Sequence, residues 1–240
     1  MLTTGTMNTP IRISPSIMCG NLLYLEHDIR ILVEGGADLL HVDMMDGHFV
    51  KNYGLCYDLV RQVRRITQIP LDLHLAMNEP EGHVRLCKDA GASFVTFHPE
   101  ATRDPHGLAD AIHAEGMRVC IAISPKLPLR EVETLFDHAD MVNVLTVNPG
   151  FAGQKLIPST LNKLAALTQK IGQKNRTIPI SVDGNVSYEN IPKMIELGAN
   201  VLVLGTSSLF RSDCPLRQSL SELMQFFHQH GYRNLQGIKS

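Results

Sequence analysis

"LVEGGADLLHVDMMDGHF", residues 32–49, contains the pattern that decides the fold of this chain. Apolar residues at helical spacing lead up to Gly35 and Gly36, and a β-rich run follows at once. Glycine at this point supplies the left-handed backbone conformation that ends a helix. The same order recurs in "DAGAS", "HAEGM" and "ELGAN", each with a glycine just before the next β-rich run. This repeat predicts parallel strands that are joined by helices.

Eight β-rich runs are spread over the chain without a composition break or a long linker. They begin at residues 11, 38, 70, 93, 117, 140, 177 and 200. Eight β-then-α units predict one closed (β/α)₈ barrel, the TIM-barrel fold of the α/β class. A doubly wound open sheet is the alternative. The barrel is expected over residues 11–232, between a polar N-terminal extension (1–10) and a C-terminal tail (233–240).

The composition argues against several classes of protein. With 44% hydrophobic residues among 240, the chain can bury a sizeable core and is not disordered. A net charge of −2 without a basic block argues against nucleic acid and membrane surfaces as partners. No run approaches the length of a membrane span, and the first residues lack the features of a secretory signal. The five cysteines are dispersed without a CxxC pair, which predicts reduced thiols and a cytoplasmic location.

Three of the predicted strands carry polar side chains that alternate with apolar ones. His41 and Asp43 alternate with apolar neighbours in "LLHVDM", and Asp72 and His74 do so in "LDLHL". Residues two apart share one face of a strand, so these side chains are expected inside the barrel. Asp183 ends the run "ISVD" in the same way. Barrel enzymes keep their chemistry at these C-terminal strand ends.

The two imidazoles and two of the carboxylates at these strand ends form a candidate metal site: His41, Asp43, His74 and Asp183. This donor set suits Zn²⁺ or another divalent first-row ion. Each residue taken alone is better explained by bonds to backbone and water, because buried polar groups usually find such partners. Their joint placement at corresponding strand ends favours a shared metal or substrate.

Glycine-containing segments follow the last three predicted strands. "NPGFAGQ", residues 148–154, precedes a helix that is expected to open near Lys155, and "VDGN" and "VLGTSSLF" follow strands seven and eight. Loops in the last two places bind phosphate in such barrels, through backbone N–H groups and a helix N-terminus. A single glycine indicates only a turn, whereas their joint placement predicts a phosphate site. No nucleotide-binding fingerprint is present.

The order of these motifs resembles that of the ribulose-phosphate 3-epimerase family, from about Ile13 to Phe210. The resemblance is carried by "ISPSIM", "GGADLLHVDMMDGHFVKN", "PLDLHL", "LTVNPGFAGQKLIP", "SVDGNV" and "VLGTSSLF". It implies a TIM barrel of the ribulose-phosphate-binding type that inverts C3 of a phosphorylated ketose. It also implies a homo-oligomer with one divalent metal ion per subunit, Zn²⁺ first and Fe²⁺, Mn²⁺ or Co²⁺ as alternatives.

The resemblance also implies a role for each matching residue. Asp43 and Asp183 resemble the acid–base pair and, with His41 and His74, the metal ligands. One carboxylate would remove the C3 proton to give a metal-stabilised enediolate, and the other would return a proton to the opposite face. The residues expected to contact the substrate and its phosphate are Ser16, Met45, His74, Gly150, Phe151, Ala152, Gly153, Gly184, Asn185, Gly205 and Thr206.

Two substrates fit the resemblance: ribulose 5-phosphate, converted to xylulose 5-phosphate, and the six-carbon allulose 6-phosphate, converted to fructose 6-phosphate. Ala76 and Leu145 stand where the family usually has methionines that cap the reacting carbons, and Met45 retains the third. Asn185 replaces a usual glycine, and Lys51 replaces a proline. "SPSIMC", "HPE" and "GTSSLF" look closer to the allulose-6-phosphate 3-epimerase branch. The smaller Ala76 would make room for the longer ketose.

A sugar-phosphate decarboxylase and a non-catalytic sugar-phosphate sensor are the alternative functions. Decarboxylases on a similar barrel use an Asp-x-Lys-x-x-Asp arrangement, but no lysine lies between Asp43 and Asp46. All four candidate ligands are retained, which disfavours the sensor. His98 and Glu100 follow the fourth predicted strand, where they either orient the substrate or form a solvated loop pair.

Overall fold

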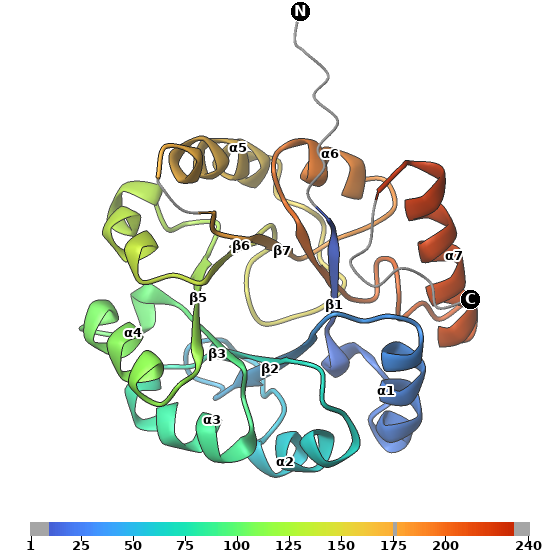
Figure 1. Cartoon of the computed structure of the whole chain (residues 1–240), viewed down its shortest axis with the longest axis horizontal. Helices are drawn as coiled ribbons and strands as arrows, with labels where there is room; N and C mark the ends of the chain where they lie inside the picture. The colour runs from blue at the N-terminus through green and yellow to red at the C-terminus, as the bar shows by residue number, and fades with distance from the viewer. Residues whose placement is uncertain (1–9, 175–176, 233–240) are drawn as a thin grey trace, which may run out of the picture.

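Eight parallel strands form one sheet with the order β1-β8-β7-β6-β5-β4-β3-β2, and helices surround it (Figure 1). The computed structural model describes residues 10–174 and 177–232. The strands are β1 (Arg12–Pro15), β2 (Leu40–Met45), β3 (Leu71–Ala76), β4 (Phe94–Phe97), β5 (Arg118–Ile123), β6 (Met141–Leu145), β7 (Ile180–Asp183) and β8 (Val201–Leu204). The predicted N-terminal extension, apart from Pro10, and the predicted C-terminal tail lie outside the described residues.

Helices connect the strands on the outside of the ring (Figure 1). They are α1 (Leu25–Glu34), α2 (Tyr57–Ile66), α3 (Val84–Ala90), α4 (Pro105–Ala114), α5 (Ser159–Gly172), α6 (Ile191–Glu196) and α7 (Leu216–Gln229). The connection between β5 and β6 differs from the expected α-helix, because it consists of two 3-10 segments, Leu129–Glu131 and Glu133–Asp137. Over residues 10–174 and 177–232, no helix is both long and apolar enough to cross a membrane.

The helix α5 begins later than the sequence predicts. It was expected near Lys155, but its first residue is Ser159, directly after Pro158. The backbone N–H of Ile157 donates to the carbonyl oxygen of Thr146 at 2.8 Å. Because the segment before α5 bonds back to the end of β6, it forms part of the barrel mouth instead of a helical turn.

A short seam between β1 and β2 closes the ring. Ser16, just after β1, forms an isolated parallel bridge with His41 of β2. The Asp38 carboxylate accepts a hydrogen bond from the Ile13 N–H at 2.8 Å, and the Ile13 carbonyl accepts bonds from Asp38 and Leu39. These contacts, with the seven parallel ladders of the sheet, confirm the predicted (β/α)₈ barrel.

Apolar side chains pack on both faces of the sheet, although the alternation along several strands also places polar residues on the inner face. Leu40, Val42 and Met44 of β2 belong to the large hydrophobic cluster, which also includes buried side chains of the surrounding helices. A separate small cluster lies on the opposite, inner face: Leu39, Phe94, Cys120, Met141 and Val201. Leu39 directly precedes β2. His41 and Asp43 share its face of the strand and come after it in the chain, so they lie nearer the C-terminal end of the barrel.

Candidate active site and metal centre

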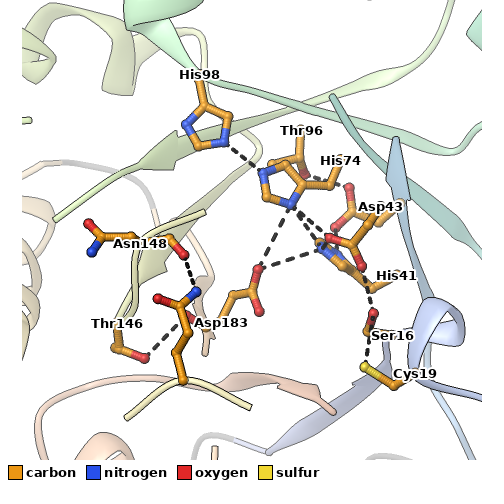
Figure 2. Close-up of polar contacts among 12 residues, drawn as sticks. Ser16, Cys19, His41, Asp43, His74, Thr96, His98, Thr146, Asn148 and Asp183 are labelled. Carbon is orange, nitrogen blue, oxygen red and sulfur yellow. Dashed lines mark hydrogen bonds and ion pairs between the residues drawn. The ribbon is translucent and has the colours of Figure 1, made fainter. Parts of the chain in front are cut away.

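Four potential metal ligands meet at the C-terminal ends of β2, β3 and β7 (Figure 2). They are the four predicted ones, His41, Asp43, His74 and Asp183, and one ligand atom from each lies within 4.8 Å of the others. His41 Nε2 lies 3.1 Å from His74 Nδ1. Asp43 Oδ1 is 3.5 Å and 3.4 Å from these two nitrogens, and Asp183 Oδ2 is 3.8 Å from each.

These separations fit a bound cation. Ligand atoms about 2.1 Å from a tetrahedral Zn²⁺ ion are about 3.4 Å apart, close to the separations measured here. The other ring nitrogens, His41 Nδ1 and His74 Nε2, have partners outside the cluster. Two imidazole lone pairs that face each other repel unless a cation or a proton lies between them. The donor set therefore suits a divalent first-row metal.

A carboxylate behind His41 fixes the orientation of its ring. His41 Nδ1 donates to Asp72 Oδ2 at 3.0 Å, and the Thr96 hydroxyl donates to Asp72 Oδ1 at 2.5 Å. With its proton on Nδ1, His41 presents the lone pair of Nε2 to the cluster. A histidine that binds a metal commonly donates its other N–H to a carboxylate in this way. The sequence predicted that Asp72 points inward, but gave it no role.

The two carboxylates of the cluster lie in unequal electrostatic surroundings. Burial disfavours the ionised form of both. At Asp43, the neighbouring His41 and His74 outweigh burial and hold the pKa well below its ordinary value. At Asp183, burial dominates and raises the pKa, and the charge of Asp43 adds to that rise. Asp183 therefore holds a proton more readily than Asp43.

A cavity that is open to solvent lies beside this cluster. Asp43, His74 and Asp183 reach the cavity wall, whereas His41 lies fully buried and is not part of the wall. The cavity is lined by every residue that was predicted to contact the substrate: Ser16, Met45, His74, Gly150, Phe151, Ala152, Gly153, Gly184, Asn185, Gly205 and Thr206.

Main chain in the left-handed region forms much of the β6–β8 side of the cavity. Gly150 has a φ of 118°, and Gly184 has a φ of 106°. A side chain on Gly184 would also meet Val147 at 2.5 Å. Asn185 has a φ of 47°. Asparagine is one of the few residues that adopt this conformation readily, so it can stand where the family usually has glycine.

Polar side chains that the sequence did not single out hold these loops in place. Thr146 donates to the carbonyl oxygens of Asp183 (3.1 Å) and Gly184. The amide of Gln154 donates to the carbonyl oxygen of Asn148 at 2.6 Å. Both residues lie in the motif "LTVNPGFAGQKLIP", but the sequence gave them no role, because their backbone acceptors are specified only by the folded loops.

The first connection contributes residues to the site beyond the predicted Ser16. The Ser16 hydroxyl donates to Asp43 Oδ2 at 2.6 Å, and Cys19 Sγ lies 4.0 Å from the Ser16 oxygen. Cys19 and Met18 both line the cavity. "SPSIMC" was the only signal in the sequence that included both residues.

The structure decides between the two interpretations of His98. Its side chain is fully buried, and its Nε2 lies 2.9 Å from Nε2 of His74 (Figure 2). Glu100 is partly exposed and accepts a hydrogen bond from Ser124. His98 is therefore not a solvated loop residue, and it lies directly behind a candidate metal ligand.

Comparison with solved structures supports the fold. The tryptophan synthase α-subunit (D110N mutant) of Pyrococcus furiosus superposes with a TM-score of 0.68 at 13% identity, covering 89% of this chain and 98% of that one. A 3-hexulose-6-phosphate synthase superposes with a TM-score of 0.67 at 18% identity, covering 90% and 99%. At these identities the likeness concerns the fold alone.

Comparison of sequences identifies the family. Ribulose-phosphate 3-epimerase of Bacillus subtilis (strain 168) is 37% identical over 214 residues, 89% of this chain and 98% of the relative. The same enzyme of Treponema pallidum (strain Nichols) is 35% identical over 201 residues, 84% and 92%. The model of the ribulose-phosphate 3 epimerase family matches residues 12–210. The predicted class of enzyme, an epimerase, is confirmed, and the chain belongs to the ribulose-phosphate 3-epimerase family.

Proposed function

We propose that this chain catalyses the metal-dependent inversion of C3 in a phosphorylated ketose. The observation that carries the proposal is the pair of carboxylates, Asp43 on β2 and Asp183 on β7, beside two imidazoles in one cavity. The same cavity borders the glycine-containing loops after β6, β7 and β8, which suit a phosphate group. Membership of the family supports the same reaction.

The reaction needs a base on one face of C3 and an acid on the other. The C3 proton is weakly acidic because it lies next to the C2 ketone. Asp43 and Asp183 come from strands that are not neighbours, so one can take the proton from one face while the other supplies a proton to the opposite face. The configuration at C3 is thereby inverted, and the two acids exchange roles in the reverse direction.

A divalent metal would be held by the four-residue cluster, His41, Asp43, His74 and Asp183. When bound, it supplies positive charge that lowers the energy of the deprotonated ketose. We propose one ion per subunit, with Zn²⁺ first and Fe²⁺, Mn²⁺ or Co²⁺ as alternatives, because mixed imidazole and carboxylate ligands accept all four. Ser16 would hold Asp43 in position through its 2.6 Å hydrogen bond.

The names of the relatives support a five-carbon substrate, ribulose 5-phosphate, converted to xylulose 5-phosphate. One observation favours a second candidate, the six-carbon allulose 6-phosphate, converted to fructose 6-phosphate. Ala76 and Leu145 line the cavity at positions where the family usually has methionine. Ala76 removes three heavy atoms from that wall, which leaves room for one more carbon of substrate.

The two alternative functions receive less support. Similarity to 3-hexulose-6-phosphate synthase extends to the fold, but the residues between Asp43 and Asp46 are both methionine, so a lysine for decarboxylase chemistry is missing there. A sensor without activity would not need four ligand atoms within 4.8 Å of one another.

Proton NMR in D₂O tests the proposal, with ribulose 5-phosphate and allulose 6-phosphate offered side by side to metal-loaded enzyme. We expect C3 deuterium exchange together with the epimer, and the faster substrate identifies the chain length. Asp183→Asn is expected to lower the rate at least about 1,000-fold, because an acid–base group is lost. Asp58→Asn, an exposed carboxylate on α2, is the matched control and should leave the rate unchanged. Absence of exchange with both substrates would contradict the proposal.

We also propose a homo-oligomer in the cytoplasm, with a ketose phosphate and not nucleic acid as the partner. All five cysteines are unpaired, in agreement with a reducing compartment. Light scattering during size-exclusion chromatography tests the oligomer, since a mass near the 26.6 kDa of one chain would contradict it.

A further inference from the structure

The two histidines of the cluster present opposite ring nitrogens to it. His41 uses Nε2, and its Nδ1 donates directly to the Asp72 carboxylate. His74 uses Nδ1, and its Nε2 meets another imidazole, that of His98, at 2.9 Å. The two ligands therefore have different outer partners: a carboxylate behind one, and a histidine behind the other (Figure 2).

The protons in this second arrangement can be assigned from the chemistry of imidazole. For His74 Nδ1 to offer a lone pair to a metal, the single proton of the neutral ring must be on Nε2. That N–H then donates to His98 Nε2, so the proton of neutral His98 must be on Nδ1. A hydrogen bond between two nitrogens that both carry protons, or that both lack them, is impossible.

The assigned proton on His98 points toward an acid. His98 Nδ1 is buried and has no hydrogen-bond partner among the described residues. The carboxylate oxygen Glu100 Oε1 lies 3.7 Å from it, and that oxygen accepts a hydrogen bond from the Ser124 hydroxyl. A buried N–H is costly when unpaired, so a slight rotation of Glu100 that completes this bond is favourable.

Packing restricts the His98 ring to this orientation. The side chain is fully buried, the ring of Phe49 lies against it with centroids 4.8 Å apart, and the ring of His74 lies nearly parallel to it, with centroids 5.0 Å apart. A ring held in this way does not need to be ordered again when a ligand binds. Such preorganisation is how residues behind a metal ligand raise its affinity.

We propose that His98 and Glu100 are positioning residues that hold His74 in the tautomer whose Nδ1 faces the metal. Glu100 orients the N–H of His98, and His98 in turn accepts the N–H of His74. This inference rests on the metal site of the proposed function. It gives the proposed metal site a second residue that supports a ligand from behind, in addition to the Asp72 carboxylate behind His41.

The test measures Zn²⁺ affinity by competition with a chromophoric chelator, together with the visible spectrum of the Co²⁺-loaded protein. His98→Phe keeps a buried ring but removes the acceptor, and we expect its Zn²⁺ Kd to rise about 10- to 100-fold. His98→Gln can place an oxygen acceptor near the position of Nε2, and we expect its Kd to stay within about threefold of wild type. His83→Phe is the matched control, because the His83 ring is stacked on Tyr57 and lies away from the cluster.

Each outcome bears on a particular claim. An unchanged Zn²⁺ Kd and Co²⁺ spectrum in His98→Phe would overturn the proposal. An equal rise of the Kd in His98→Phe and His98→Gln would overturn it too, because the changed shape of the side chain would then explain the weaker binding. Where circular dichroism shows that His98→Phe does not fold, Glu100→Leu carries the test, because leucine is of similar size but has no acceptor: a Kd raised severalfold supports the proposed role of Glu100 and His98, and an unchanged one overturns it. Wild-type protein that binds no Zn²⁺ or Co²⁺ would contradict the proposed function itself.

Discussion

The β2–β4 side of the barrel mouth and its β6–β8 side are built by different means. On the first, side chains bind side chains in a dense network, His41 with Asp72 and His74 with His98. On the second, backbone with positive φ lines the cavity, as at Gly184 and neighbouring residues. A cation needs lone pairs from side chains, whereas a phosphate is bound well by main-chain N–H groups. One cavity therefore offers complementary surroundings for the two ends of a ketose phosphate.

Removal of the metal gives the largest expected effect and separates the two sides. Dialysis against a strong chelator should lower the C3 exchange rate at least about 1,000-fold, because the charge that stabilises the deprotonated ketose is lost. The melting temperature should also fall, because a ligand of the native state is removed. Inorganic phosphate should still bind, as measured by calorimetry, since the backbone of the loops after β6, β7 and β8 contributes none of the four candidate metal ligands. Full exchange activity in metal-free protein would contradict the assignment of the first side.

The substitution Gly184→Ala tests the β6–β8 side of the cavity. Gly184→Ala would bring Cβ to 2.5 Å from Val147, at a φ of 106° that side chains avoid. Strain of about 1–3 kcal/mol is expected. We expect KM for the phosphorylated ketose to rise about tenfold or more, and by a larger factor than the Zn²⁺ Kd, even though Gly184 directly follows the candidate ligand Asp183. Gly172→Ala, where the added Cβ meets nothing within 4 Å, is the control. Loss of Zn²⁺ affinity in Gly184→Ala would show that the two sides are not independent.

Substrate length depends on the wall between the two sides. Ala76→Met restores the residue usual in the family and fills part of the cavity. The ratio of kcat/KM for allulose 6-phosphate to that for ribulose 5-phosphate should fall about tenfold, as the difference of one carbon in a pocket allows. Ala111→Met, exposed on α4, serves as the control. A ratio that does not change would remove Ala76 as the determinant of length.

Cys19 gives the smallest and most local effect. It contacts Ser16 on the metal side and lies 3.4 Å from the position of a Cβ on Gly205. Burial raises the pKa of its thiol to about 11, with the charge of Asp43 adding to the rise, so it stays protonated at pH 8. Iodoacetamide should therefore label exposed Cys56 first, and labelling of Cys19 should increase as the pH approaches 11. Faster labelling of Cys19 than of Cys56 at pH 8, read by peptide mass mapping, would contradict this order.

The sequence was sufficient for the barrel and for the metal cluster because both follow from local periodicity. Alternation along β2 fixes which face His41 and Asp43 occupy, and the parallel order of strands brings their C-terminal ends together. His74 and Asp183 follow from the same rule on β3 and β7.

The outer partners could not be predicted, because they depend on contacts between distant strands and loops. His98 lies just past the end of β4, where alternation no longer specifies a face, and its burial depends on Phe49 from another connection. Asp72 was predicted inside the barrel, but its bond to His41 requires the register of β2 against β3. The onset of α5 was misplaced because the bond between Ile157 and Thr146 is not visible in the sequence.

The seam between β1 and β2 has a consequence for the order of folding. All four residues of β1 pair with β8. Arg12–Pro15 therefore cannot complete its strand pairing until Val201–Leu204, near the other end of the chain, has been synthesised. β2 is synthesised soon after β1, but among the described residues the two strands are connected by a single bridge and a few hydrogen bonds. During synthesis on a ribosome, Ser16 therefore reaches its place beside Asp43 only when nearly the whole chain has emerged. A nascent chain that stops before β8 lacks a finished barrel mouth, even though all four candidate metal ligands have already been made.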